Sequence, residues 1–189
     1  QVFSQVVDKL YVPEQLKVNS LDPGPPLGLL GILENYYRRL RTEVGLDIGA
    51  DTSHSNRADI IGRVNTVLTR WRIYSDFAAA VRCYMEARLD GDRETLDLLR
   101  RWFRADQDVR IREKGILRPI QKINAKDHLR SLSCLLVGLG YRGLLIIIDE
   151  LERIMQESRT RRLKAYTLLR ELIDNVDGEN GMERTCFYC

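Results

Sequence analysis

The clearest candidate for chemistry is a pair of adjacent acids, Asp149 and Glu150, that directly follows the apolar run 144–148. An apolar run without alternation is typical of a strand in the interior of a parallel sheet that helices cover. Ligands of open parallel sheets bind outside the carboxyl ends of the strands. One carboxylate there could hold hydrated Mg²⁺ against nucleotide phosphates, and its neighbour could orient the attacking water. We assign the metal to Asp149 and the water to Glu150; the alternative is that both acids only cap the following helix.

The sequence around the acid pair points to a nucleotide site. An apolar strand that ends in Asp-Glu looks like the second nucleotide motif of P-loop ATPases. The surrounding stretch reads GYRGLLIIIDELERI, followed by the arginine-rich helix RTRRLKAYTLLRELIDN and a glycine-bearing turn. This part of the chain resembles the P-loop ATP-binding proteins of bacterial BREX-type phage-defence systems, relatives of the AAA+ ATPases of the origin-recognition kind. The resemblance is strongest over residues 127–189, weaker over the helices before them and absent over residues 1–25.

The resemblance implies an ATPase that uses ATP and Mg²⁺, with Asp149 and Glu150 on its acidic pair and Glu152 completing an Asp-Glu-Leu-Glu signature. It also places residues 184–189 on the next strand, whose end carries a polar sensor residue in AAA+ proteins. The sequence contains no G-x-x-x-x-G-K-[ST] loop, whose backbone amides and lysine hold phosphates. The chain also begins with a residue other than Met and ends in RTCFYC, an apolar stretch that no turn closes. We therefore expect a fragment that binds ATP poorly and is inactive by itself.

A second candidate site is the basic segment that follows the acid pair. Between residues 153 and 170 six basic residues stand against the single acid Glu157. Arg159, Arg161, Arg162 and Lys164 could contact DNA phosphates. They could instead contact a neighbouring subunit, because ring-forming ATPases place arginines against a neighbour's γ-phosphate. The third interpretation is a solvated helix face whose opposite side is core.

Three other patterns carry less weight. Gly138, Gly140 and Gly143 match the dinucleotide fingerprint G-x-G-x-x-G, but they follow a predicted helix and precede a strand, which reverses the required order. We interpret them as a helix stop and a tight turn. Cys186 and Cys189 form a C-x-x-C without a second Cys or His pair, and a buried strand explains them better than a redox or zinc site. Neither histidine has a Cys or His at metal-binding spacing, and no G-x-S-x-G elbow indicates a serine hydrolase.

Composition excludes some classes of protein. With 189 residues, 44% of them hydrophobic and 30% charged, the chain has enough apolar material for a core and is not a disordered tail. Its longest apolar run is far shorter than a membrane span, so we expect a soluble protein without a membrane partner. Four cysteines, with Cys83 and Cys134 in apolar helical patterns, favour free thiols and the cytoplasm. The net charge of +3 over the whole chain is uninformative about the class of protein.

The elements that must position these residues follow from periodicity and punctuation. Residues 1–8 alternate as a short strand, and 22–26 are a Pro/Gly break. Helical spacing predicts helices over 27–44, 57–74 and 76–90, and a fourth after Asp92, which is a good N-cap. Residues 45–56 are predicted as a loop and 105–126 as connections with short helical turns. A helix from Asp127, a strand over 143–148, a helix over 158–176 with Leu163, Tyr166 and Leu169 inward, and a terminal strand complete the chain.

This order predicts an α/β fold that helices dominate: a partial, AAA+-like P-loop parallel sheet with a large, mostly helical insert. We expect the strand 143–148 to lie between two others. The predicted domains are an N-terminal strand and connection (1–26), a helical insert (27–126) and the part of a P-loop ATPase domain that bears the Walker B motif (127–189). The predicted function is that of a partial P-loop NTPase domain that binds and hydrolyses ATP, with nucleotide, DNA, a second copy or other defence proteins as candidate partners. The alternative is a non-catalytic helical interaction or DNA-binding module.

Overall fold

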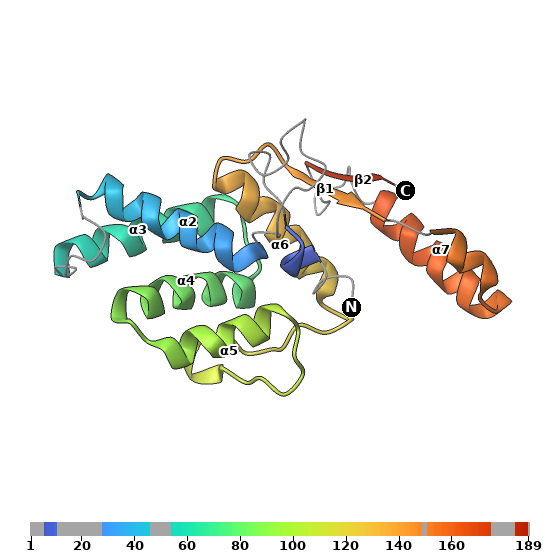
Figure 1. Cartoon of the computed structure of the whole chain (residues 1–189), viewed down its shortest axis with the longest axis horizontal. Coiled ribbons are helices and arrows are strands. Elements are labelled where there is room, and N and C mark those ends of the chain that lie inside the picture. Colours follow the sequence, from blue (N-terminus) through green and yellow to red (C-terminus); the bar gives the residue numbers. More distant parts are fainter. Residues whose placement is uncertain (1–5, 11–27, 46–53, 149–150, 175–183, 189) are drawn as a thin grey trace, which may run out of the picture. The chain divides into compact units, whose positions relative to one another are not determined.

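The computed structural model describes residues 6–10, 28–45, 54–148, 151–174 and 184–188 (Figure 1). The chain divides into two compact units, Gln1–Leu129 and Arg130–Cys189. The division of the chain into a connection, an insert and a P-loop part stays a prediction.

Helices make up most of the first unit, as the sequence predicts (Figure 1). Residues 6–8 are helical, so the strand predicted over 1–8 is wrong for the part that the structure describes. The polar loop predicted over 45–56 is wrong at its end, because a helix already begins at His54. The helices are α2 (Gly28–Glu43), α3 (His54–Arg70), α4 (Ser75–Asp90), α5 (Arg93–Phe103) and the start of α6 (Ala125–Gly138).

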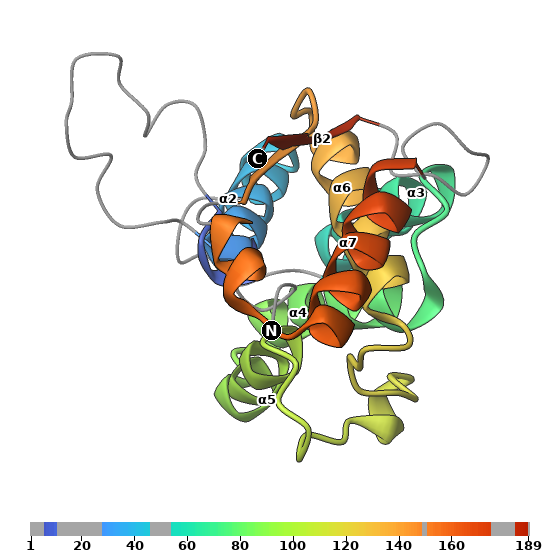
Figure 2. The ribbon, with the colours of Figure 1, turned by 90° about the vertical axis from the view of Figure 1, so that its right-hand side faces the viewer.

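The α4 helix is the centre of the first unit, and α2, α3 and α5 all contact it (Figures 1 and 2). Phe77 on α4 meets Phe103 on α5 edge to face, with ring centroids 5.6 Å apart, and both side chains are fully buried. Such aromatic pairs stabilise a core beyond the area they bury. Asp92 caps α5 as predicted: its carboxylate accepts from the backbone N–H of Thr95 at 3.0 Å.

The connection between α5 and α6 consists of short turns, which confirms its prediction. It contains the 3₁₀ helix η1 (Arg112–Lys114) and a single antiparallel bridge between Ile111 and Ile116. Asp76, a buried carboxylate on α4, holds this connection by accepting from the backbone N–H of Leu117 at 2.7 Å. The indole N–H of Trp102 donates to the Arg118 carbonyl at 3.2 Å. Buried polar contacts of this kind fix a segment that has no regular ladder of its own.

The second unit holds the rest of α6 and a parallel strand pair, β1 (Leu144–Ile147) and β2 (Thr185–Tyr188), in register Leu144 to Thr185. The parallel pairing confirms the predicted α/β character. Leu144 and Ile146 are buried, whereas Leu145 and Ile147 are exposed. Within the described residues β1 pairs with β2 alone, so the expectation of a strand buried on both faces between two neighbours is not met there. An apolar run shows only that both faces of a strand can be covered. It does not show that other elements cover them.

The crossover from β1 to β2 contains η2 (Leu151–Gln156) and α7 (Arg159–Asp174), and η2 leads directly into α7 (Figure 2). The prediction that Leu163 and Tyr166 face inward is wrong, because both side chains are exposed, and Leu169 is only half-buried. No residue from Leu151 to Glu171 is buried. The apolar spacing of α7 correctly predicted a helix, but it did not indicate what the apolar side packs against.

Candidate functional site

Asp149 and Glu150, the predicted metal and water residues, lie outside the described residues, and so does Cys189. The strands on either side of the acid pair are described. Ile147 is in register with Tyr188, and the backbone N–H of Ile148 donates to the Tyr188 carbonyl at 2.8 Å. The carboxyl ends of β1 and β2 therefore meet at one edge, which is where open parallel sheets bind ligands.

Backbone contact at the other end of β1 sets the register of the pair. The Leu144 N–H donates to the Arg184 carbonyl at 2.9 Å. A Cβ on Gly143 would lie 2.3 Å from the same carbonyl oxygen, so only glycine lets the two backbones approach this closely. Gly140, at φ +99°, ends α6. The interpretation of these glycines as a helix stop and turn is confirmed, with the close approach at Gly143 as an additional reason.

A buried polar contact anchors β2 to α6 within the second unit. The Thr185 hydroxyl donates to the Ser133 hydroxyl at 2.7 Å, and both residues are buried. Cys186 is an exposed free thiol, so its prediction as part of a buried strand is wrong for that side chain. Cys83 on α4 and Cys134 on α6 are thiols outside any disulfide, which matches their prediction.

The helix α7 does not bring the four predicted basic residues to one side. At about 100° per residue, Arg159 and Arg162 lie about 60° apart, and Arg161 with Lys164 form a second such pair on another side. Arg161 pairs with Glu157 at 3.2 Å, and the Arg162 guanidinium donates to the Met155 carbonyl at 3.3 Å. A flat partner surface placed against α7 can therefore contact either Arg159 with Arg162 or Arg161 with Lys164, but not all four residues at once.

One buried titratable group received no role in the sequence analysis. His128 in the first turns of α6 is fully buried. Its ring lies 5.1 Å from Tyr74, 6.0 Å from Phe77 and 5.3 Å from Trp102, measured between ring centroids. Burial among these rings lowers the pKa of His128 to about 4, because the charged imidazolium loses its hydration. The sequence signal was the spacing of His128 and Leu132, which places the histidine on the buried side of α6.

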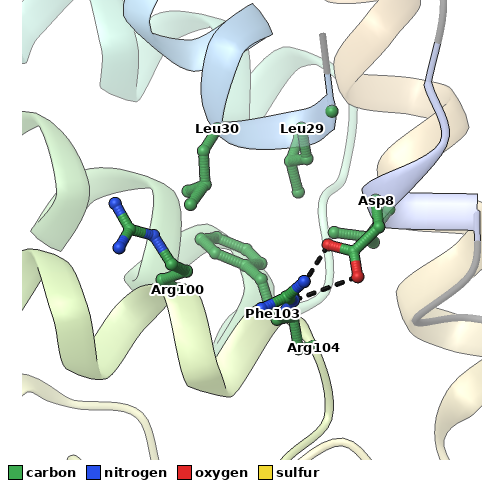
Figure 3. Close-up of a pocket in the computed structure, with 8 residues that line it drawn as sticks. Asp8, Leu29, Leu30, Arg100, Phe103 and Arg104 are labelled. Atoms are coloured by element: carbon green, nitrogen blue, oxygen red, sulfur yellow. Dashed lines mark hydrogen bonds and ion pairs between the residues drawn. The ribbon is translucent and has the colours of Figure 1, made fainter. Parts of the chain in front are cut away.

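A pocket of about 220 Å³ lies in the first unit, between the start of α2 and the end of α5 (Figure 3). Leu29, Phe103 and Arg104 help line it, and Arg104 donates from Nε to both Asp8 oxygens at 3.0 and 3.1 Å. Arg100, the other cation of the lining, pairs with Asp97 at 3.1 Å. Both guanidiniums thus already have carboxylate partners, and we assign this pocket no ligand.

The described part of the chain holds no group of three or more His, Cys, Asp or Glu that could bind a metal ion. Across the same residues no helix combines the length and the apolar character needed to cross a membrane.

Comparison with known proteins identifies one family. The family described as BREX system ATP-binding protein BrxC/D matches residues 8–187. No curated protein and no solved structure matches the chain.

Proposed function

The chain belongs to the BREX system ATP-binding protein BrxC/D family, and we propose that it supplies the metal and water side of an AAA+-like ATPase site in bacterial phage defence. Asp149 would hold Mg²⁺ against the phosphates of ATP. Glu150 would orient the attacking water. The protein would act in the cytoplasm, and a second copy or other defence proteins are its candidate partners.

The parallel register of β1 and β2 is the observation that carries this proposal. Ile148 lies at the edge where the carboxyl ends of both strands meet. Asp149 and Glu150 follow Ile148 in the sequence, and carboxylate oxygens are the ligands that Mg²⁺ prefers. When bound, Mg²⁺ would neutralise charge that develops on the phosphates.

The chain lacks a G-x-x-x-x-G-K-[ST] loop. In this proposal, residues outside the printed sequence grip the phosphates, and the chain alone binds ATP weakly. The competing function is a non-catalytic interaction module in which the two acids only cap the following helix.

Two substitutions in the complete natural protein separate these functions. If Glu150 orients water, Glu150→Gln abolishes ATP turnover and preserves or tightens ATP binding. If Asp149 holds Mg²⁺, Asp149→Ala weakens the Mg²⁺-dependent part of ATP binding. Turnover is measured as phosphate release, and binding with a fluorescent ATP analogue at varied Mg²⁺ concentration.

The matched control is Glu113→Gln, an exposed glutamate on η1 in the other unit, which should leave both quantities unchanged. Turnover at the wild-type rate in Glu150→Gln would show that another group activates the water. Equal ATP binding by Asp149→Ala and wild type at every Mg²⁺ concentration would leave the acids as a helix cap.

DNA or a neighbouring subunit is a second proposed contact, through Arg159, Arg161, Arg162 and Lys164. Arg159, Arg161 and Lys164 are exposed and Arg162 is half-buried. A DNA duplex or a neighbouring subunit could therefore reach these side chains. Because the helix separates the four residues into two pairs, a duplex against one side would gain about two phosphate contacts.

A further inference from the structure

The connection between α5 and α6 carries a cluster of basic side chains. Between residues 110 and 126 it holds six basic residues and one acid, Glu113, and all seven are exposed. Arg110 donates to two backbone carbonyls, and Lys114 interacts electrostatically with Asp92. Within the described part of the chain, no hydrogen bond or ion pair involves the side chains of the other four, Arg112, Arg118, Lys122 and Lys126. These four cations are therefore available to an external acid.

Buried contacts fix the backbone that carries these cations. Ile116 and Ile120 are fully buried in the first unit. Between them, the N–H of Leu117 and the carbonyl of Arg118 each bond to a buried side chain, on α4 at 2.7 Å and on α5 at 3.2 Å. Arg118 therefore stands on a backbone that packing and hydrogen bonds hold in place.

A second turn presents Lys122 in the same way. Asn124 is buried, accepts from the Gln121 N–H at 2.6 Å through Oδ1 and donates to the Pro119 carbonyl at 3.0 Å through Nδ2. These two bonds close the turn that contains Lys122 and Ile123. Binding at this connection therefore requires little ordering of its backbone, which favours affinity.

Two aliphatic side chains lie directly beside the cations in the sequence. Leu117 is 62% exposed and precedes Arg118, and Ile123 is 90% exposed and follows Lys122. The two therefore add exposed aliphatic groups to the positive charge of the connection. The α5–α6 basic surface, as we call it, consists of Arg112, Leu117, Arg118, Lys122, Ile123 and Lys126.

We propose that the α5–α6 basic surface binds an acidic protein segment that also carries aliphatic side chains. The carboxylates of such a segment would meet the four available cations, and charge complementarity would favour the encounter. Its aliphatic groups would cover Leu117 and Ile123. This inference rests neither on the proposed ATPase activity nor on the proposed contact through α7.

Charge and aliphatic exposure together favour this partner over two others. A nucleic-acid duplex would satisfy the cations, but Leu117 and Ile123 would then lie against phosphate and sugar, where their apolar surface gains little. A second copy that presented the same surface would bring like charges together. An acidic segment with aliphatic side chains satisfies both kinds of group.

The test uses the whole chain and three synthetic 12-residue peptides labelled with fluorescein. The first peptide alternates glutamate with leucine, the second has lysine in place of glutamate, and the third has serine in place of leucine. Binding is followed by fluorescence anisotropy, and the helix content of each variant of the chain by circular dichroism. The first peptide should bind at least about tenfold more tightly than the second and about threefold more tightly than the third.

Two double variants with the same loss of charge give the decisive comparison. Arg118→Gln with Lys122→Gln should weaken binding of the first peptide by about tenfold at unchanged helix content. Arg38→Gln with Arg63→Gln is the matched control, because both arginines are exposed but each already pairs with a glutamate of the chain, at 3.1 and 2.9 Å. Leu117→Ser should weaken binding of the first peptide but not of the third.

Several results would overturn the proposal. Equal binding of the first and second peptides would remove the role of charge, and equal effects of the two double variants would assign binding to net charge instead of this surface. Equal effects of Leu117→Ser on the first and third peptides would remove the role of the aliphatic groups. A 16-base-pair duplex that binds more tightly than the first peptide and is insensitive to Leu117→Ser would assign the surface to nucleic acid. Self-association of the chain that Arg118→Gln with Lys122→Gln abolishes would assign it to a second copy.

Discussion

The buried imidazole of His128 should make the stability of the chain depend on pH. Its pKa lies at about 4 in the folded chain, against about 6.5 for an ordinary histidine. Between these two values the unfolded chain binds more protons than the folded chain, so the free energy of unfolding rises with pH. The contribution of the neutral His128 imidazole to the free energy of unfolding is complete above about pH 6.5 and is lost as the pH falls towards about 4.

The size of this effect follows from the shift. A pKa difference of about 2.5 units corresponds to about 3 kcal/mol in total, at about 1.4 kcal/mol per unit. From about pH 7 to about pH 5 the linkage relation gives a loss of about 2 kcal/mol. Carboxylates also titrate as the pH falls, so the quantity to measure is the difference between wild type and a variant that lacks the imidazole.

The assay is urea unfolding at pH 7, 6 and 5, followed by the fluorescence of the two tryptophans, Trp71 and Trp102, of which Trp102 has its ring 5.3 Å from the imidazole. His128→Leu keeps an apolar side chain of similar volume and should lose less stability than wild type on acidification, by about 2 kcal/mol. His54→Leu is the matched control, because His54 is exposed at the start of α3 and should leave the pH dependence unchanged. Parallel pH dependence in wild type and His128→Leu would refute the reasoning.

Three further predictions test local features. Gly143→Ala should destabilise the β1–β2 pair by about 1–3 kcal/mol, because its Cβ meets a backbone carbonyl, whereas Gly62→Ala in open space on α3 should be neutral or stabilising; urea unfolding compares them. Asp92→Ala should lower the melting temperature more than Asp92→Asn, because asparagine keeps an acceptor for the α5 N-terminus. If Arg161 and Lys164 contact a duplex, log K against log salt should have a slope of about −1.8, and reversing both charges should bring that slope to about zero; an unchanged slope would contradict the contact.

Much of the helical architecture could be predicted because the signals are local. The cap at Asp92 and the helix stop at Gly140 depend on residues within one turn of each other, and both are as expected. The helical segment at residues 6–8 was missed because loose alternation over so few residues fits a strand equally well. The depth of His128 was missed because it depends on rings from α4 and α5, far away in the sequence.

The parallel strands beside the candidate site were predictable, but their burial was less so, and the chemistry of Asp149 and Glu150 stays a prediction. The parallel pairing of β1 and β2 agrees with the strand-acid-helix-strand order. The exposure of Leu145 and Ile147 does not follow from that order, because an apolar residue type states only that burial would be favourable. Whether another element covers such a residue depends on segments that are distant in the sequence, and the residues next to it do not indicate them.

Helices α2 and α7 show how the residue types along one helix face relate to its burial. On α2, Leu29, Leu33, Tyr36 and Leu40 follow the spacing i, i+4, i+7, i+11, and all four are buried. On α7, Arg159, Leu163, Tyr166 and Arg170 follow the same spacing, but arginines occupy both end positions and all four residues are exposed. Burying a charge is costly, so an apolar face can enter a core along its whole length, whereas a face that begins and ends with arginine stays open at its ends. The period of the pattern therefore predicts the helix, and the residue types at the ends of the face decide how much of it a core can take.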